Sequence, residues 1–398
     1  MTRIPFILGF LLVFASSVTG QQQGELETWG LDSYGQVSNT PTHNDYVEVA
    51  GGLDHSLALK LDGSMISWGA DYDLQVSNTP TGNDFVQIAG GGTHSLALKS
   101  DGSIVSWGAD YDLQVSNTPS GNDFIQVAGG DSHSIALLSN GSLIVWGRDL
   151  EGQVSNTPTG NDFTQIASGW LHCHALKSDG SIVSWGADYD LQVSNTPPGN
   201  DFLQITGGGM HSTALKTDGS IVSWGNDLWG QVSNTPTGND FVKVAGGIVH
   251  ALAIKFDGSV VSWGNDAFGQ VSDTPSGNRV IQIAGGGFHS TTISTREPTL
   301  SVSNLAAGQT ALVEVANATP NNYSHFAWSI HGGGPISTPF GDAMLTPPYH
   351  LKLLSTDSTG YASYTANIPP AAAGITVWCH GTDVGTQSML NALMLVIQ

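Results

Sequence analysis

Tryptophan, aspartate and histidine recur in this sequence at one fixed spacing, and all three can serve binding or catalysis. Trp-Gly returns every 39 residues, at Trp29, Trp68, Trp107, Trp146, Trp185, Trp224 and Trp263. An Asp follows each of these Trp residues by three positions, and a His keeps the same period: His55, His94, His133, His172, His211, His250 and His289. Catalysis normally needs one asymmetric constellation. Seven equal copies favour a structural interpretation, in which Trp and His hold neighbouring repeats together and Asp caps a turn.

Calcium is the alternative for the Asp residues, through three pairs spaced i, i+2: Asp71 with Asp73, Asp110 with Asp112, and Asp188 with Asp190. Such pairs supply only part of a shell of about six to eight oxygens. His172 and His174 share one face of an expected strand but lack further ligands, and Gly90–Gly92 is not followed by the Lys of a phosphate-binding loop. We therefore predict no catalytic residues, no metal and no cofactor.

The repeated segment itself predicts short antiparallel strands. In the unit that starts at Asp101, the runs 103–107, 124–128 and 134–138 alternate as half-buried strands do, and Asp-Gly, Gly-Gly and Asn-Thr-Pro lie between them. Each unit is thus a small sheet with exposed edges, and radial repetition of such sheets forms a β-propeller. The segment 25–28 supplies one strand, while 280–284 and 290–293 supply the others of a unit, so the two ends should complete a seventh blade.

The repeat resembles that of the regulator of chromosome condensation family. The likeness rests on Trp-Gly, a following Gly-Gln as at Gly152-Gln153, Ala-Gly-Gly-x-x-His-Ser-x-Ala-Leu and Asp-Gly. It implies an all-β fold with a seven-bladed propeller. The short repeats are most similar to the secreted bacterial branch, such as the propeller-type β-lactamase inhibitory protein. The nuclear branch has an inserted wedge that acts on the GTPase Ran; there is no room for it here, so nucleotide exchange is not implied.

Strand order predicts which turns share a face of the propeller. The Gly-Gly-x-x-His turns and the turns after Trp-Gly should lie on one face, and the Asp-Gly turns and Asn-Thr-Pro loops mainly on the other. The repeats differ most on the first face, where large apolar residues gather. These are the candidate partner-binding residues: Trp170, Leu171, Met210, Ile248 and Phe288 before the His residues, and Tyr34, Tyr72, Tyr111, Tyr189, Trp229 and Phe268 after Trp-Gly. Inward-folded plugs and evolutionary drift are the alternatives to a binding surface.

The charge balance excludes some classes of partner. The 398-residue chain has 33 acidic and 11 basic side chains, a formal charge of −22. DNA- or RNA-coating proteins need a basic surface, so no nucleic-acid partner is expected. Residues 1–20 are predicted to be a signal peptide, because a basic start, the apolar run 4–18 and small residues before Gln21 follow that pattern. No membrane span is expected, because the apolar run is shorter than about 20 residues.

After Thr295 the 39-residue period stops. We expect a propeller over residues 21–296 and a β-sandwich accessory domain over 297–398, with strand-like runs at 300–302, 311–315, 324–330, 361–368 and 376–380. The two cysteines, Cys173 and Cys379, fall in different domains and are not expected to pair.

Together these features predict an exported, monomeric, non-enzymatic protein that binds an extracellular or cell-surface protein through one propeller face. A glycan-binding protein or glycan-active enzyme is the first alternative, since aromatic turns can serve as sugar platforms. A purely structural cell-surface protein is the second.

Overall fold

The computed structural model describes residues 23–277, 279–295, 299–318, 322–329, 335–338, 341–344, 350–357, 360–383, 388–390 and 393–398. These residues form two compact units, Gln23–Ser294 and Thr295–Gln398, and each is described by itself. The predicted signal peptide, residues 1–20, lies outside the described residues.

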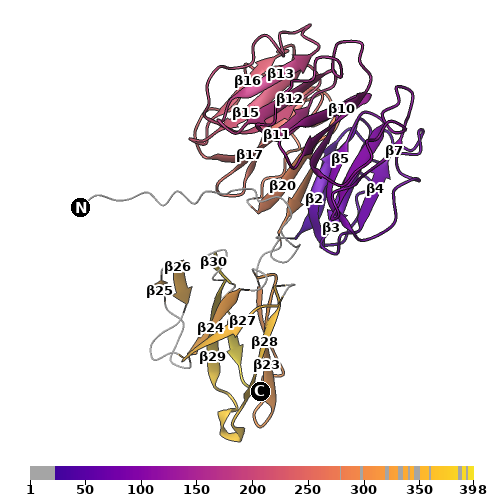
Figure 1. Ribbon diagram of the computed structural model, residues 1–398. Helices are drawn as coiled ribbons and strands as arrows, with labels where there is room; N and C mark the ends of the chain where they lie inside the picture. The colour runs from indigo at the N-terminus through magenta and orange to yellow at the C-terminus, as the bar shows by residue number, and fades with distance from the viewer. Residues whose placement is uncertain are drawn as a thin grey trace. The chain divides into compact units, whose positions relative to one another are not determined.

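Seven three-stranded antiparallel sheets make up the first unit, one for each repeat (Figure 1). The blades are β2–β4 (Tyr46–Gly51, His55–Lys60, Met65–Gly69), β5–β7 (Phe85–Gly90, His94–Lys99, Ile104–Gly108), β8–β10 (Phe124–Gly129, His133–Leu138, Leu143–Gly147), β11–β13 (Phe163–Ser168, His172–Lys177, Ile182–Gly186), β14–β16 (Phe202–Gly207, His211–Lys216, Ile221–Gly225), β17–β19 (Phe241–Gly246, His250–Lys255, Val260–Gly264) and β20, β21 and β1 (Val280–Gly285, His289–Ser294, Glu25–Gly30). The predicted seven-bladed β-propeller is confirmed.

The seventh blade is assembled from both ends of the propeller. β1 pairs antiparallel with β21, from Glu25 opposite Ser294 to Gly30 opposite His289, and β20 pairs with the other side of β21. The first strands of successive blades contact one another around the axis, and β20 contacts β2. The ring is therefore closed by strand pairing between distant parts of the sequence.

The core of the propeller lies between blades and not within them. Leu57 and Leu59 of the first blade are buried against Phe85, Ile88 and Trp107 of the second. The same arrangement recurs around the ring, and at the closure Tyr46 and Trp68 of the first blade pack with Ile293 of the seventh. A single blade cannot bury its apolar faces alone, so each repeat depends on its neighbours.

Main-chain hydrogen bonds also link the inner hairpin turns into a closed ring. Leu53 N donates to Gly92 O at 3.0 Å, the bond recurs from turn to turn, and Gly287 N donates back to the carbonyls of Gly52 and Leu53 at 3.0 Å. Glycine permits this close approach: a Cβ at Gly209 would lie 2.5 Å from the carbonyl oxygen of Ile248.

The repeated histidines form a second ring, one layer below these turns. Nε2 of a His in one blade is hydrogen-bonded to the Ser hydroxyl that follows the His of the next blade. The bonds are 2.7–2.9 Å long and join His55 to Ser95, His94 to Ser134, His172 to Ser212, His250 to Ser290, and His289 to Ser56. All seven histidines are fully buried. The predicted structural role of the His residues is confirmed.

Two positions of this histidine ring depart from the pattern. Nε2 of His133 is hydrogen-bonded to the Cys173 thiol at 3.1 Å and to the Ser168 hydroxyl at 2.9 Å. His211 faces the blade in which Ala251 stands where the other blades have a hydroxyl or thiol, and its Nε2 is buried with no hydrogen-bond partner among the described residues. One inter-blade hydrogen bond is thus missing.

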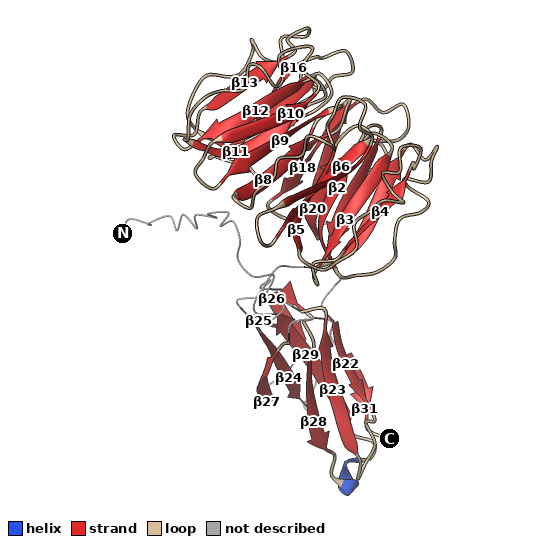
Figure 2. Cartoon of the chain, turned by 45° about the vertical axis from the view of Figure 1, so that its right-hand side comes forward, coloured by secondary structure: helices blue, strands red, loops and turns tan. Residues whose placement is uncertain are grey.

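The second unit contains two antiparallel sheets (Figure 2). One is β22 (Thr299–Ser303), β23 (Thr310–Ala316) and β28 (Ala362–Asn367); the other is β27 (His350–Ser355), β24 (Tyr323–Ser329), β29 (Thr376–Asp383), β30 (Ser388–Met389) and β31 (Leu393–Val396). Both sheets contribute to one core, in which Val313 and Val315 lie with Phe326 and Val377. This is the expected β-sandwich. The short pair β25 (Pro335–Thr338) and β26 (Gly341–Met344) and the 3-10 helix η1 (Pro370–Ala372) are further elements.

Both cysteines are buried and free, as expected. Within the described part of the chain, no helix combines the length and apolar character that crossing a bilayer requires.

Supplying the missing hydroxyl should stabilise the propeller. Ala251→Ser gives His211 the partner that its counterparts have, and a buried hydrogen bond contributes about 1 kcal/mol. Ser95→Ala is the matched opposite change and should lower the free energy of unfolding by about 1–3 kcal/mol, because it orphans His55. Urea unfolding at neutral pH measures both, and a destabilised Ala251→Ser variant would contradict this account.

The histidine ring should also make the propeller sensitive to acid. Burial lowers the pKa of His55, His133 and His250 to about 3 and that of His94, His211 and His289 to about 4, and it holds that of His172 well below 6.5. The unfolded chain then binds more protons, so stability is lost as pH falls below about 6.5. Seven such residues cost roughly 7 kcal/mol between pH 6.5 and pH 5.5. Tryptophan fluorescence should show cooperative unfolding between about pH 4 and 6; a propeller intact at pH 3.5 would refute this.

Candidate functional site

The turns of the propeller lie on two opposite faces. Each turn after Trp-Gly is bonded to the inner hairpin turn of its own blade, as Ala70 N is to Asp54 O at 2.8 Å. Each Asp-Gly turn instead meets the segment that enters the next blade, as Gly63 O accepts from Phe85 N at 3.1 Å. We call the first surface the Trp-Gly face; it comprises residues 31–36, 52–54, 70–75, 91–93, 109–114, 130–132, 148–153, 169–171, 187–192, 208–210, 226–231, 247–249, 265–270 and 286–288. The other surface is the Asp-Gly face.

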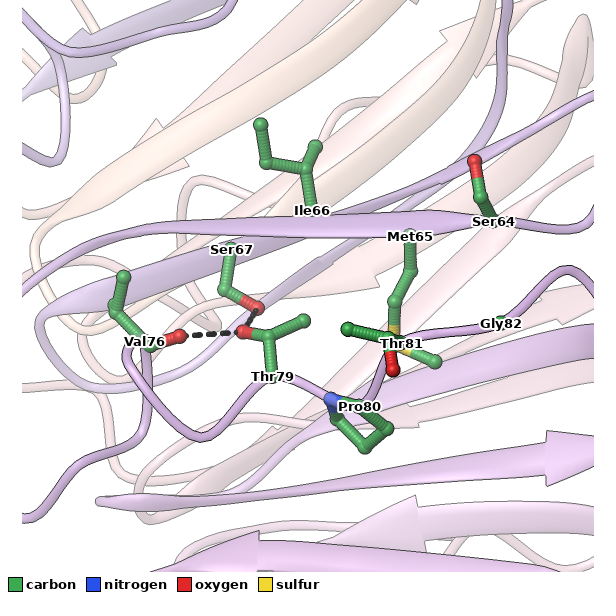
Figure 3. Close-up of a pocket in the computed structure, with 9 residues that line it drawn as sticks. All are labelled: Ser64, Met65, Ile66, Ser67, Val76, Thr79, Pro80, Thr81 and Gly82. Carbon is green, nitrogen blue, oxygen red and sulfur yellow. Dashed lines mark hydrogen bonds between the residues drawn. The ribbon is translucent and has the colours of Figure 1, made fainter.

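The expected position of the Asn-Thr-Pro loops needs a correction. Thr79 Oγ1 donates to Val76 O at 2.6 Å and is hydrogen-bonded to the Ser67 hydroxyl at 2.8 Å, and Ser67 lies within β4. These bonds tie the loop to the outer strand, so it runs along the side of the blade. Figure 3 shows the open groove that results between β4 and Pro80. Its two central hydroxyls are bonded to each other, so the groove offers little for binding.

The turns after Trp-Gly are rigidly built by the residues that recur in them. Asp71 Oδ1 accepts hydrogen bonds from the backbone N–H groups of Val76 and Ser77 at 2.9 and 2.8 Å, which confirms the predicted capping role. Together with the Ser77 hydroxyl, these donors lower the pKa of Asp71. Gln75 is fully buried, and its Oε1 accepts from Asp73 N at 2.8 Å. Side chains between these anchors are directed away from the fold.

The same turns are bonded to the next blade. Trp68 Nε1 donates to Gln36 O at 2.9 Å and Trp107 Nε1 to Gln75 O at 3.0 Å; the bond is repeated for all seven Trp residues. Each Trp therefore fixes the turn of the preceding blade, and the Trp-Gly face is held by the same contacts that hold the ring.

The structure separates the predicted partner-binding residues into two groups. Those after Trp-Gly are all exposed: Tyr34, Tyr72, Tyr111, Tyr189, Trp229 and Phe268, with Tyr111 80 % exposed. Those in the hairpin turns are only partly exposed: Trp170, Leu171, Met210, Ile248 and Phe288. Trp170 and Ile248 donate their backbone N–H groups to the ring of inner turns. Phe288 contacts Phe268 edge-on, with ring centroids 5.6 Å apart.

Several exposed aromatic residues are bonded to acidic side chains of a neighbouring turn. Tyr111 Oη donates to Asp73 Oδ1 at 2.6 Å, and Tyr72 Oη donates to Asp54 Oδ2 at 3.3 Å. Tyr34 packs edge-on against Tyr72, with centroids 5.9 Å apart. Tyr34, Tyr72 and Tyr111 thus form a connected arc over three adjacent blades.

Sequence reasoning missed a set of leucines on this face. Leu74, Leu113 and Leu191 are 51, 52 and 51 % exposed and have φ angles of 60, 63 and 62°. In the other four turns, glycine occupies this left-handed position: Gly35, Gly152, Gly230 and Gly269. Lining up the seven repeats would have shown three leucines where backbone geometry favours glycine. Leu150 and Leu228 add further exposed apolar surface.

Sequence reasoning also missed an asymmetric pair at the propeller axis. The third residue of the first strand is Gln in five blades. In four of them it bridges to the next blade, as Gln126 does: its Oε1 accepts from Ile166 N at 2.9 Å and its Nε2 donates to Ile166 O at 3.1 Å. The exceptions are Glu48 and Lys243. They flank the seventh blade, and Lys243 Nζ donates to Gln282 of that blade.

The two exceptions are electrostatically coupled. Burial raises the pKa of Glu48 to about 8, against the opposing effect of the Lys243 charge. Burial likewise lowers the pKa of Lys243, against the opposing effect of Glu48. In the sequence, both residues stand where the other five repeats have Gln. This is visible only when the seven repeats are aligned, and the electrostatic pairing of the two residues is not visible from either residue alone.

The metal alternatives find no support. The ring centroids of His172 and His174 lie 4.8 Å apart. Nε2 of each ring is hydrogen-bonded to the Ser212 hydroxyl, at 2.9 and 2.7 Å. Among the residues that the structure describes, no group of three or more His, Cys, Asp or Glu side chains is placed to hold a metal ion.

Comparison with known proteins identifies the repeat. The regulator of chromosome condensation (RCC1) repeat is recognised over residues 85–114, 124–153 and 241–270. RCC1 repeats are thus present in three places in the seven-bladed propeller, as the resemblance implied. No curated protein matches it. The likeness to the secreted short-repeat branch stays a prediction.

Solved structures support the same fold. Prp20p from Saccharomyces cerevisiae, studied for its binding to Gsp1p and histones, is 20 % identical, and the match covers 71 % of this chain and 92 % of Prp20p with a TM-score of 0.58. Human WBSCR16 is 17 % identical over 68 % of this chain and 98 % of its own, also at 0.58. The ectodomain of the Arabidopsis thaliana receptor kinase ACR4 is 20 % identical, over 62 % and 92 %, at 0.51.

The axial pair can be tested by restoring the common residue. Because the pKa of Glu48 is already about 8, Lys243→Gln alone should cost little at pH 7 and about 1 kcal/mol at pH 9, where the wild-type carboxyl is ionised beside Lys243. Glu48→Gln with Lys243→Gln should stay within about 1 kcal/mol of the wild type at both pH values. Urea unfolding at pH 7 and pH 9 measures the cycle. Strictly additive single and double variants would show that the two side chains are not coupled.

Proposed function

We propose that this chain is an exported, non-enzymatic protein-binding module that captures an extracellular or cell-surface protein on its Trp-Gly face. The observation that carries the proposal is the arc of exposed aromatic residues on turns that capping and inter-blade bonds make rigid. Aromatic residues are enriched in the energetic centres of protein interfaces. Preorganised turns lose little conformational entropy on binding, which favours affinity.

Two further points support a binding role. Prp20p, a propeller of the same fold, binds Gsp1p and histones. Most of the recurring polar groups are engaged in the fold: six of the seven His residues are hydrogen-bonded through Nε2, Asp caps the turns, and the Gln side-chain oxygens accept bonds within the buried turns. Export rests on the predicted signal peptide, residues 1–20.

Glycan binding is the second candidate. Exposed Tyr rings beside carboxylates, such as Tyr111 with Asp73, could stack on sugars and accept hydrogen bonds from their hydroxyls. Binding of the full chain to a glycan array, with loss on Tyr111→Ala, would favour this alternative over the protein partner.

A photo-crosslinking experiment distinguishes the two faces. A benzophenone side chain replaces Tyr111 on the Trp-Gly face or Phe256 on the Asp-Gly face; these are comparably exposed aromatic residues, at 80 and 86 %. The full chain is then irradiated in the medium around the cells that produce it. We expect a discrete protein adduct from position 111 and none from position 256.

Two other outcomes of the crosslinking experiment would contradict the proposed function. Adducts only from position 256 would place the binding surface on the Asp-Gly face. No adduct from either position would oppose a protein partner and favour the glycan-binding or structural alternatives.

A further inference from the structure

The three identical turns at 70–75, 109–114 and 187–192 carry a residue that the fold does not explain. Each has the sequence Ala-Asp-Tyr-Asp-Leu-Gln, and we call them the Tyr-Asp-Leu turns. Their leucines, Leu74, Leu113 and Leu191, have φ angles of 60–63°, a conformation that L side chains rarely adopt. Four other turns fill the same position with glycine, so the backbone does not require leucine.

The leucine side chains also contribute little to folding. Each is about half exposed and none belongs to a core cluster of the propeller. The two backbone hydrogen bonds at this position run from Leu74 N to Asp71 O at 3.2 Å and from Asn78 N to Leu74 O at 3.1 Å. Gly152 makes the same two bonds, with Asp149 O at 3.4 Å and Asn156 N at 3.2 Å. Strained, exposed residues of this kind are concentrated at functional sites.

The charge of the Trp-Gly face indicates which kind of partner can bind these exposed apolar side chains. Thirteen acidic residues lie on the Trp-Gly face: Asp32, Asp54, Asp71, Asp73, Asp110, Asp112, Asp131, Asp149, Glu151, Asp188, Asp190, Asp227 and Asp266. The face has a single basic residue, Arg148, which is already paired with Glu151 at 3.3 Å. A basic partner is attracted to this potential, and an acidic one is repelled.

The Asp-Gly face provides an internal contrast. There the five lysines that end the middle strands are paired with Asp residues at 3.1–3.5 Å: Lys60 with Asp45, Lys99 with Asp84, Lys177 with Asp162, Lys216 with Asp201, and Lys255 with Asp240. The Asp-Gly turns add Asp62, Asp101, Asp179, Asp218 and Asp257, so this face is acidic as well. Its five lysines offset part of the negative charge, whereas the Trp-Gly face has one basic residue and is the more strongly one-signed of the two.

Resting on the proposed function above, we propose that the Tyr-Asp-Leu turns are repeated contact points for a cationic protein surface in which Lys or Arg side chains alternate with apolar ones. Each turn offers a Tyr ring for the aliphatic stem or the cationic head, an Asp for the charge, and a Leu for the apolar neighbour. Because three turns repeat the same chemistry, the contacts strengthen one another when a single partner spans more than one turn.

The test uses the full chain and a synthetic peptide of alternating Lys and Leu, with an alternating Glu-Leu peptide as the charge control. The variant combines Leu74→Gly, Leu113→Gly and Leu191→Gly, which installs the residue found in the other four turns. We expect the Kd for the Lys-Leu peptide to rise at least tenfold, with the thermal midpoint unchanged or higher. Phe256→Ala, on the Asp-Gly face, is the control and should leave the Kd unchanged.

Three results of the peptide test would overturn the inference. Equal affinity of the wild type and the triple glycine variant would mean that the leucines are not contacts, and equal or stronger binding of the Glu-Leu peptide would remove the charge argument. No binding of the Lys-Leu peptide would also overturn the inference. An adduct at position 111 together with a failed peptide test would leave the proposed function standing and refute only the cationic partner.

Discussion

The structure depends on contacts between blades. A three-stranded blade has no core of its own, and its polar residues are completed by the next blade: a His by a Ser hydroxyl, a Trp by a Gln carbonyl, and an inner turn by its neighbour's backbone. Because each bond is made around a closed ring, the residues involved recur with the repeat. The glycine content and much of the acidic charge have the same origin, since both belong to turns and caps copied with each blade.

This arrangement separates the residues that hold the propeller from those available for binding. Asp71 and Gln75 hold the turn through hydrogen bonds within it, and Trp107 of the next blade holds it through a bond to the Gln75 carbonyl. The side chains between Asp71 and Gln75 are therefore not needed to fix the backbone of the turn. A left-handed Leu can persist there because the surrounding bonds over-determine the backbone. Under the proposed function, stability and recognition are carried by different side chains of the same six-residue turn. Three copies of that turn differ from the other four, and the ring is closed all the same.

The sequence predicted the architecture well because the repeat period and the number of strands between two turns can both be counted along the chain, and these counts determine the blades and their two faces. The 39-residue period predicted the blades, the complementary partial units at 25–28 and 280–293 predicted closure, and the number of strands between turns predicted the two faces. Three features could not be obtained this way. The left-handed leucines require backbone angles, the coupling of Glu48 with Lys243 requires knowing that their strands flank one blade, and the course of the Asn-Thr-Pro loop is decided by one Thr side chain against β4. The partial burial of Trp170 and Ile248 likewise follows from the inner-turn ring, which no local pattern reveals.

Hydrogen exchange provides the most direct test that a rigid ring carries a separable binding face. It is measured on the free chain and on the chain saturated with the Lys-Leu peptide. The account predicts that the middle strands, such as His94–Lys99, are strongly protected in both states, and that added protection is confined to residues 70–75, 109–114 and 187–192. Added protection in the Asp-Gly turns, or a change spread through the middle strands, would contradict it.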